Sequence, residues 1–331
     1  MSGKEEGNGE KHITSIGGQA VMEGVMMRGP FKTVTAVRKP DGEIAKKIDE
    51  NGTKTRPKIC RFPIIRGCVS FIDSLVIGMK SLMYSAEFVD IEEDGEEEQS
   101  KFDKWLEDKL GDKIKDVVIY FAIFLSIVFS VALFILLPSL LASLFEAIPA
   151  LQPVTSTQAF TSVFEGIMRM AIFLGYMVLI SRMKEIKRVF EYHGAEHKTI
   201  ACYEGGDELT VENVKKYTRF HPRCGTSFLL FVMIISIIIF AFLPRFDDFP
   251  RIASIFLRMG TRILCLPVVA GLSFEVIKWA GRSKNCIVGA LSKPGLWLQR
   301  LTTREPDDSQ IEVAIESMLP CIPENKEEDK W

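Results

Sequence analysis

Residues 191–224 read EYHGAEHKTIACYEGGDELTVENVKKYTRFHPRC, and the rest of the chain is arranged around this stretch. Three of the four histidines of the chain lie in it, at positions 193, 197 and 221. His193 and His197 are four residues apart, a spacing that places both imidazoles on one face of a helix. His221 and Cys224 are three residues apart, as a turn allows. Because a long apolar segment stands on each side, we interpret the stretch as a metal site on a loop between two membrane-spanning helices.

The side chains of this loop match the ligands that zinc prefers. Zinc binds histidine nitrogen and cysteine sulfur, with four protein ligands in structural sites and three plus water in catalytic sites. We therefore predict a zinc site with four ligands: His193, His197, His221 and Cys224. Three nearby side chains are alternative ligands: Cys202, Glu204 and Asp207. The competing interpretation is that the histidines make polar contacts with the backbone or with lipid headgroups.

Glu196 gives the site an enzymatic interpretation. Residues 193–197 follow the pattern His-x-x-Glu-His, in which two histidines bind the metal and the glutamate is the general base. Glu196 would then accept a proton from the water that attacks a carbonyl or phosphoryl centre. The alternatives are that Glu196 is a solvated helix residue or that it holds a ligating histidine in place. Four protein ligands would leave no position for water, so catalysis requires that either Cys224 or His221 is not a ligand.

The composition of the chain combines many apolar residues with many charged ones. Hydrophobic residues make up 47% of the 331 residues and charged residues 25%, with a mean hydropathy of +0.15. The two kinds are segregated into blocks along the chain. The net charge of -2 gives no general attraction for nucleic acid, so no nucleic-acid partner is expected. The seven cysteines are odd in number and show no repeated spacing, which favours reduced thiols facing a cytosol.

Four apolar segments predict a membrane domain over residues 101–280. A helix needs about 20 apolar residues to cross a bilayer. The predicted spans are residues 117–137, 163–180, 226–243 and 254–280. The second and fourth spans carry charged residues, among which Glu165 and Arg169 are spaced to neutralise each other. Because charged residues inside spans are functional candidates by default, a transport pathway is a further interpretation.

Lysine and arginine in the connecting segments set the predicted orientation. Segment 181–225 carries nine of them, whereas segment 145–162 carries none. Residues 101–116 carry five, and residues 281–304 carry five more. We therefore predict a multi-pass protein of the inner cell membrane, with both termini and the His/Cys loop 181–225 in the cytoplasm.

The region before the spans, residues 13–100, is predicted to be cytoplasmic and to follow a disordered segment, residues 1–12. Residues 33–38 and 43–48 alternate in polarity around Asp41-Gly42, which predicts a β-hairpin. This hairpin is the small β element that we expect in an otherwise helical protein.

Three further stretches of this region are assigned from their patterns. Residues 16–30 contain four glycines, and we expect a loop packed on its methionines, in which Glu23 and Arg28 pair with each other or bind a ligand. Residues 64–88 have helical periodicity and predict an amphipathic helix on the membrane surface or packed against the bundle. Residues 90–99 are acidic and predict a solvated linker.

The region after the spans is predicted to be a cytoplasmic segment, residues 281–319, followed by a charged tail, residues 320–331. Pro306 with acidic residues just after it is typical of a helix start. The helix that follows would present one apolar face, made by Ile311, Ala314, Ile315 and Met318.

Several long motifs, in matching order, resemble a known family. They are GGQAVMEGVMMRGP at 17–30, FPIIRG at 62–67, EYHGAEHK at 191–198, HPRCGTSF at 221–228 and PGLWLQRLTTREPDDSQIEVAI at 294–315. They resemble the bacterial DUF1385, or YqhQ-like, family over roughly residues 12–318. The resemblance implies a multi-spanning membrane protein described as a predicted metal-dependent enzyme, with no known substrate. The metal role implied for the family falls here on His193, His197, His221 and Cys224.

The fold class predicted from the sequence is mainly α: a multi-spanning membrane protein with about four transmembrane helices, a small N-terminal β element and cytoplasmic helices. The predicted function is that of an integral membrane protein with a cytoplasmic-side metal site, a metal-dependent hydrolase of unknown substrate. One alternative is a non-enzymatic membrane scaffold whose loop is stapled by the metal. Another is a transporter or channel, in which four spans form a pathway by homo-oligomerising. The expected partner is the lipid bilayer.

Overall fold

The computed structural model describes residues 12–51, 57–88, 114–146, 148, 158–244, 246, 248–282 and 286–330. The chain divides into two compact units. The first unit comprises residues 1–89, 177–232 and 267–331, and the second unit comprises residues 90–176 and 233–266. The acidic linker 90–99 lies outside the described residues, as does all of the segment 1–12 except His12.

A four-stranded antiparallel sheet lies in the first unit. Its strands are β1 (Gly17–Val21), β2 (Gly24–Arg28), β3 (Lys32–Arg38) and β4 (Ile44–Glu50), in the order β1-β2-β3-β4. The predicted hairpin is confirmed as β3 and β4, with Arg38 opposite Ile44. Gly42 in the connecting turn has a φ of 87°, a left-handed conformation that glycine adopts without strain.

The loop predicted for residues 16–30 is wrong, because β1 and β2 form a second hairpin there. Four of the five residues of β2 are buried, on both faces of the strand. A strand covered on both faces lacks the alternation of polar and apolar residues that identifies strands in a sequence. Glu23, in the turn between the two strands, has a φ of 49° and pairs with Arg188 rather than with Arg28.

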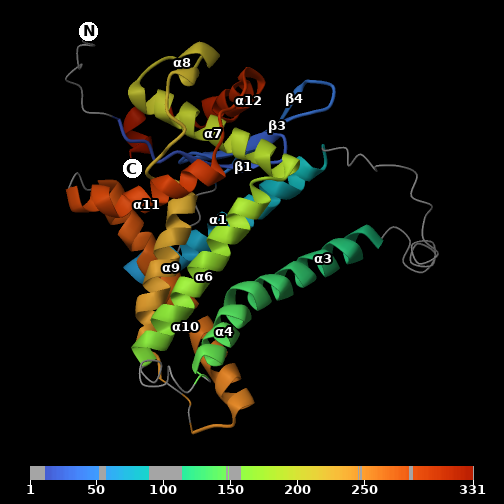
Figure 1. The fold of residues 1–331 in the computed structure, drawn as a ribbon. Coiled ribbons are helices and arrows are strands. Elements are labelled where there is room, and N and C mark those ends of the chain that lie inside the picture. Colours follow the sequence, from blue (N-terminus) through green and yellow to red (C-terminus); the bar gives the residue numbers. More distant parts are fainter. Residues whose placement is uncertain are drawn as a thin grey trace, which may run out of the picture. The chain divides into compact units, whose positions relative to one another are not determined.

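Two helices pack on this sheet and close its core. Helix α7 (Lys184–Gly205) contacts β1, and helix α12 (Asp308–Met318) contacts β2, β3 and α7 (Figure 1). The start of α12 has a capping box between Asp307 and Gln310, which satisfies free backbone N–H groups. The predicted apolar face of α12 is buried in this core. The N-terminal sheet, the His/Cys region and the C-terminal helix therefore share one hydrophobic core.

The charged segment 320–331 is also tied to this core. Two short 3-10 helices follow α12, η5 (Leu319–Cys321) and η6 (Lys326–Asp329). Asp329 is buried and accepts hydrogen bonds from Thr14 Oγ1 at 2.6 Å and from the Tyr203 hydroxyl at 3.0 Å. Its other carboxylate oxygen lies 2.8 Å from His12 Nε2. The segment predicted as a charged tail thus contributes a buried carboxylate that holds the N-terminal residues in place.

Four more of the described helices lie wholly in the first unit. The predicted amphipathic helix is α1 (Pro63–Ala86), preceded by η1 (Lys58–Arg61). The short helix α8 (Val211–Lys215) lies in the loop after α7, and α11 (Cys286–Thr302) precedes α12. Pro63 stands in the first turn of α1, where its missing N–H costs nothing.

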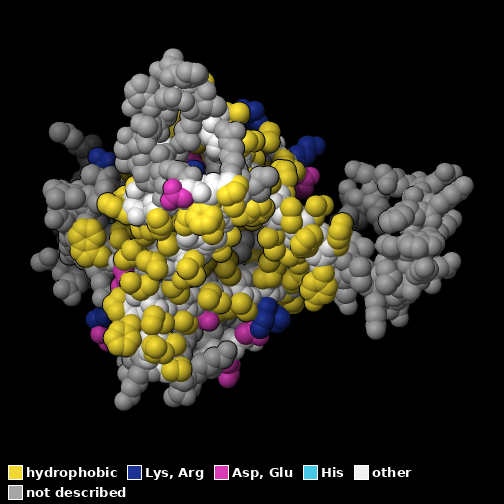
Figure 2. All heavy atoms as spheres, turned by 90° about the horizontal axis from the view of Figure 1, so that it is seen from below, with side chains coloured by type: hydrophobic (Ala, Val, Ile, Leu, Met, Phe, Trp, Pro, Cys, Tyr) yellow, Lys and Arg dark blue, Asp and Glu magenta, His cyan; other side chains and the backbone are white. Residues whose placement is uncertain are grey.

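Within the described residues, three helices are long and apolar enough to cross a membrane: Tyr120–Phe145, Phe160–Ile180 and Phe256–Trp279. The first is made of α3 (Ile114–Val131), the π-helix η3 (Ala132–Leu136) and α4 (Leu137–Glu146). The others lie in α6 (Gln158–Ile180) and α10 (Arg251–Arg282). Figure 2 shows apolar side chains over most of the described surface in that view.

The four predicted spans are not confirmed as a set. The segment predicted as the third span, residues 226–243, forms α9 (Gly225–Ala241), whose apolar part Phe228–Ala241 is shorter than the other three. The sequence prediction counted apolar residues up to Leu243, but the helix ends two residues earlier.

The charged residues of the second unit pair differently from the prediction. Glu165 forms an ion pair with Arg262, which also donates to Ser139 Oγ at 3.0 Å. Arg169 donates from Nε to the carbonyl of Phe134, at 2.9 Å, in the π-helical segment. Arg169 thus binds the backbone of the π-helical segment. Glu165 and Arg169 therefore have structural partners other than each other.

Candidate metal centre

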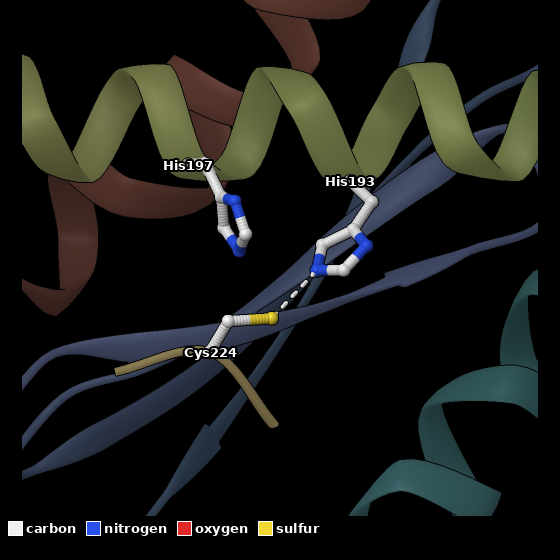
Figure 3. Close-up of side chains that lie close together, drawn as sticks. All are labelled: His193, His197 and Cys224. Atoms are coloured by element: carbon white, nitrogen blue, oxygen red, sulfur yellow. Dashed lines mark hydrogen bonds between the residues drawn. The ribbon is translucent and has the colours of Figure 1, made fainter. Parts of the chain in front are cut away.

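Helix α7 presents His193 and His197 side by side. Their ring centroids are 4.4 Å apart, and both rings project from one side of the helix toward Cys224 (Figure 3). The distance between His193 Nε2 and Cys224 Sγ is 3.3 Å. The four-residue spacing therefore predicted correctly that His193 and His197 share one face of a helix. The fold brings Cys224 to this pair.

Backbone carbonyls fix the orientation of both rings. His193 Nδ1 lies 2.8 Å from the carbonyl oxygen of Thr302, and His197 Nδ1 lies 2.6 Å from that of Arg219. A carbonyl can only accept, so each Nδ1 carries a proton and each Nε2 is turned toward Cys224. Histidines that bind metals commonly use one ring nitrogen as the ligand while the other donates to a fixed acceptor.

The contact to Thr302 depends on Gly194. A Cβ atom at Gly194 would lie 2.0 Å from the carbonyl oxygen of Arg304, so a larger residue would push the two backbones apart. The backbone N–H of Arg304 donates to the carbonyl of Phe190 at 2.8 Å, which ties the end of α11 to α7. The glycine within the His-Gly-Ala-Glu-His segment therefore lets the residue 302–304 backbone reach the histidine ring.

The ligand atoms of His193, His197 and Cys224 all lie within 4.8 Å of one another. A zinc ion bound at about 2.0–2.1 Å from nitrogen and about 2.3 Å from sulfur holds the ligand atoms of a tetrahedral site about 3.3–3.7 Å apart, so a small inward movement of these side chains would close the cluster on an ion. His197 and Cys224 are buried, and His193 is partly buried. The donor set and its spacing therefore fit a single zinc ion.

The electrostatics of this cluster favour the thiolate of Cys224. Burial pushes the pKa of Cys224 upward, but the neighbouring His193 and His197 outweigh it and hold that pKa well below its usual range. Burial likewise lowers the pKa of His193, yet the Cys224 sulfur raises it, to about 9. Thiolate is the form of cysteine that binds metals, whereas His193 would have to release a proton when a metal binds.

His221, the fourth predicted ligand, lies beside the cluster in a different set of contacts. Its Nε2 is 3.5 Å from Glu204 Oε2 and 3.3 Å from the guanidinium of Arg223. Gln299 holds its backbone, accepting from the N–H and donating to the carbonyl. The ring centroids of His197 and His221 are 5.7 Å apart. The structure thus brings three of the four predicted ligands together, and the ligand role of His221 stays a prediction.

The alternative ligands have contacts of their own. Cys202 lies near the backbone carbonyls of residues 207 and 208, and Asp207 accepts from the Tyr217 hydroxyl at 2.8 Å. Glu204 pairs with Arg223 and accepts from the backbone N–H of Thr14 at 2.9 Å. These contacts give all three side chains partners outside the cluster of His193, His197 and Cys224.

Glu196 is buried next to the centre, with only 4% of its surface exposed. Gly18, in β1, lies against its carboxyl group, and the N–H of Gly18 favours the charged carboxylate. Its Oε2 atom has no hydrogen-bond partner among the described residues. Burial raises the pKa of Glu196, while the two histidines oppose that shift. The interpretation of Glu196 as a solvated helix residue is therefore wrong.

Sequence reasoning did not assign four residues that shape the centre: Gly18, Arg219, Gln299 and Thr302. Three of them act through backbone groups, which carry no side-chain signature. Gln299 lies in a segment singled out only for its resemblance to a family. The glycine pair at 17 and 18 was noted, but nothing in its local sequence points to a partner in α7.

These features define a largely helical protein with helices long and apolar enough to cross a membrane. It also has a His/Cys cluster next to a buried carboxylate oxygen that has no hydrogen-bond partner among the described residues. The chain belongs to the DUF1385 family, a family of proteins of unknown function, whose model matches residues 62–324. It is also 37% identical to the "Uncharacterized protein YqhQ" of Bacillus subtilis (strain 168), over 308 residues that cover 92% of this chain and 91% of that protein. No solved structure matches the chain. The predicted family is confirmed, and its description names no metal.

Proposed function

We propose that the protein is a multi-pass membrane hydrolase that depends on zinc held by His193, His197 and Cys224. The observation that carries this proposal is a cluster of three candidate ligands next to Glu196, whose buried Oε2 has no hydrogen-bond partner among the described residues. Three protein ligands with an open fourth position are typical of catalytic zinc sites. A thiolate combined with imidazoles favours zinc over hard cations such as magnesium.

Each group in the proposed site has one task. Zinc supplies the Lewis acidity that brings the pKa of water close to neutrality. Glu196, held through Gly18, accepts the proton of the attacking water at Oε2. A bond forms from the water oxygen to a carbonyl carbon or phosphorus, and the bond to the leaving group breaks. Glu196 then returns its proton to the leaving group, which completes a hydrolysis.

The shared core of the first unit supports a particular topology. The chain leaves the first unit after residue 89 and returns at residue 177, then leaves it after residue 232 and returns at residue 267. Each excursion must cross the membrane an even number of times, so α9 crosses together with α10. The 17 residues of α9 extend about 26 Å, slightly less than a hydrocarbon core of about 30 Å, and local thinning accommodates the difference. The nine basic residues of segment 181–225 put this core in the cytoplasm.

The proposed site lies at the level of the lipid headgroups. Cys224 stands four residues before Phe228, where the apolar part of α9 begins. Four residues of helix rise about 6 Å, which is close to the thickness of one headgroup layer. The bond that is cleaved is therefore proposed to lie near the membrane surface.

A structural metal is the second candidate function. The cluster joins α7 to the segment 219–224 and, through Thr302, to α11, so a bound ion would staple three parts of the first unit. In that case His221 supplies the fourth ligand and Glu196 is dispensable. The transport alternative has less support, because the described charges of the second unit have structural partners.

Metal analysis of the purified protein tests the proposal. We expect close to one zinc per chain, lost in His193→Ala, His197→Ala and Cys224→Ser. Cys202→Ser is the matched control, because Cys202 is also a buried thiol of the first unit but contacts backbone carbonyls. Wild-type protein purified without chelator and containing no metal would refute both the hydrolase and the staple.

A further inference from the structure

Helix α1 has two unlike faces. One face is buried and made of small residues: Gly67, Gly78, Ser81 and Ser85. The other face exposes large apolar side chains: Ile64, Ile65, Ile72, Leu75, Val76, Met79 and Met83. Two more apolar residues just before the helix, Ile59 and Phe62, are also exposed. A continuous apolar surface of this kind on one helix marks a contact with a partner or with lipid.

The first turns of α1 cross α10. Arg66 makes a bidentate ion pair with Glu275, with its NH2 group 2.7 and 2.8 Å from the two carboxylate oxygens. Gly67 approaches so closely that a Cβ atom there would lie 2.8 Å from the Cα of Gly271. The thiol of Cys68 donates to the carbonyl of Pro267 at 2.8 Å.

These contacts lie inside the candidate span Phe256–Trp279. Trp279 is exposed at the end of this span, a position where tryptophan typically sits at a membrane surface. Gly271 is eight helical residues further in, which is about 12 Å along the axis. Half of a hydrocarbon core is about 15 Å, so the crossing point lies well below the surface.

The other half of α1 is fixed on the extramembrane sheet. Gly78 packs so tightly on β1 that a Cβ atom would lie 2.3 Å from Gln19 Oε1, and Thr35 Oγ1 donates to Ser81 Oγ at 3.1 Å. Between the two halves, the rings of Phe71 and Phe228 lie 5.7 Å apart. Because Phe228 is the first residue of the apolar part of α9, Phe71 marks the level of the membrane surface.

We propose that α1 is a membrane-inserted arm: its first two turns dip among the acyl chains, and the rest lies along the surface with its apolar face toward lipid. Its occupant is the bilayer because the small-residue face of α1 rests, at Gly67, on the candidate span Phe256–Trp279, which leaves the opposite, exposed face at the depth of the acyl chains. The charges between residues 58 and 87 agree, since four are basic and two are acidic: Lys58, Arg61, Arg66, Lys80, Asp73 and Glu87. An excess of basic over acidic residues on a membrane-bound segment attracts anionic lipids.

Photo-crosslinking of the full-length protein tests the arm. Benzoylphenylalanine replaces Ile65 or Ile72, and the protein is reconstituted in nanodiscs of phosphatidylcholine and phosphatidylglycerol. The matched control is Ile48, whose exposed fraction of 51% is close to the 57% of Ile72 but which lies on β4. After irradiation, lipid adducts are measured by mass spectrometry.

We expect about tenfold more lipid adduct at 65 and 72 than at 48, because acyl chains surround an inserted side chain. Adducts at 65 should be on the acyl chain. Lipid adduct no greater than at 48, or adducts mainly to a second copy of the chain, would overturn the proposal. Met79, which is 50% exposed, is a further position, so that a failure to fold at one site does not decide the outcome.

Discussion

Gly18 lies against the carboxyl group of Glu196, which brings the first strand of the sheet to the proposed general base. A Cβ atom at Gly18 would lie 2.6 Å from the carbonyl oxygen of Met26 and 3.0 Å from Glu196 Cδ. The strand can approach α7 at this position only because glycine has no side chain. The link explains why a segment near the N-terminus belongs to a site whose candidate ligands lie near residue 200.

Gly18→Ala should therefore destabilise the protein by about 1–3 kcal/mol, the usual cost of forcing an extra methyl group into a packed site. Gly17→Ala is the control, because nothing lies within 4 Å of a Cβ atom at Gly17. Thermal unfolding of both variants in the same detergent compares them. Equal unfolding temperatures for the two would show that the close approach of β1 to α7 is not needed for stability.

Glu196→Gln distinguishes the two proposed roles of the zinc ion, catalytic and structural. Glutamine keeps the size of the side chain but cannot accept a proton at neutral pH. We expect the variant to keep its zinc and its unfolding temperature while losing about 10²–10⁴-fold in activity, the usual contribution of a general base. Complementation of a deletion strain, with zinc measured on the same protein, makes the comparison. Full complementation would eliminate the enzymatic interpretation, and Glu185→Gln, an exposed residue of the same helix, controls for the loss of a charge.

Zinc removal should lower the stability of the wild-type protein. An ion that binds only the folded state contributes its binding free energy to folding, so a chelator should lower the unfolding temperature by several degrees. Cys224→Ser should start at the lower temperature and respond little to the chelator. A wild-type protein that keeps its unfolding temperature after verified metal loss would contradict this expectation.

The crossing of α1 and α10 should be sensitive to added volume. Gly271→Ala places a Cβ atom 2.5 Å from the carbonyl oxygen of Ile64, so it should cost about 1–3 kcal/mol in the free energy of unfolding. Gly260→Ala in the same helix has nothing within 4 Å and should be neutral or slightly stabilising. Unfolding in lipid nanodiscs distinguishes the pair, and an equal effect of both would mean that α1 does not rest on α10.

Asp329 should matter although it lies two residues from the end of the sequence. Asp329→Ala leaves Thr14 and Tyr203 without their buried acceptor, at a cost of about 1–3 kcal/mol. Glu328 is an exposed neighbour, so Glu328→Ala should leave the free energy of unfolding unchanged. Limited proteolysis near Thr14 gives a direct reading, because the N-terminal segment should be cut faster in the Asp329 variant only.

Local patterns predicted the parts of this protein that depend on local rules. The spacing of His193 and His197 identified the helical pair, and Asp41-Gly42 identified a hairpin. The hairpin of β1 and β2 was missed because a strand buried on both faces has no alternation. The Thr302 and Arg219 carbonyls were missed because they belong to backbone that only the fold brings to α7. The place of Asp329 was missed because an acidic residue near a chain end is usually solvated.

The shared core of the sheet and α12 has a consequence for how the protein is made in the cell. The strands β1 to β4 are translated before α12, which covers β2 and β3, and the chain from α1 to α11 is made between them. The apolar face of the sheet that α12 covers therefore stays exposed while the segments between β4 and α12 are synthesised and inserted. Such non-local pairings form slowly and leave aggregation-prone surface exposed in the meantime. A nascent chain stopped before residue 308 would be a substrate for chaperones and proteases, and the His193–Cys224 cluster would reach its final form only after the C-terminal helix is released.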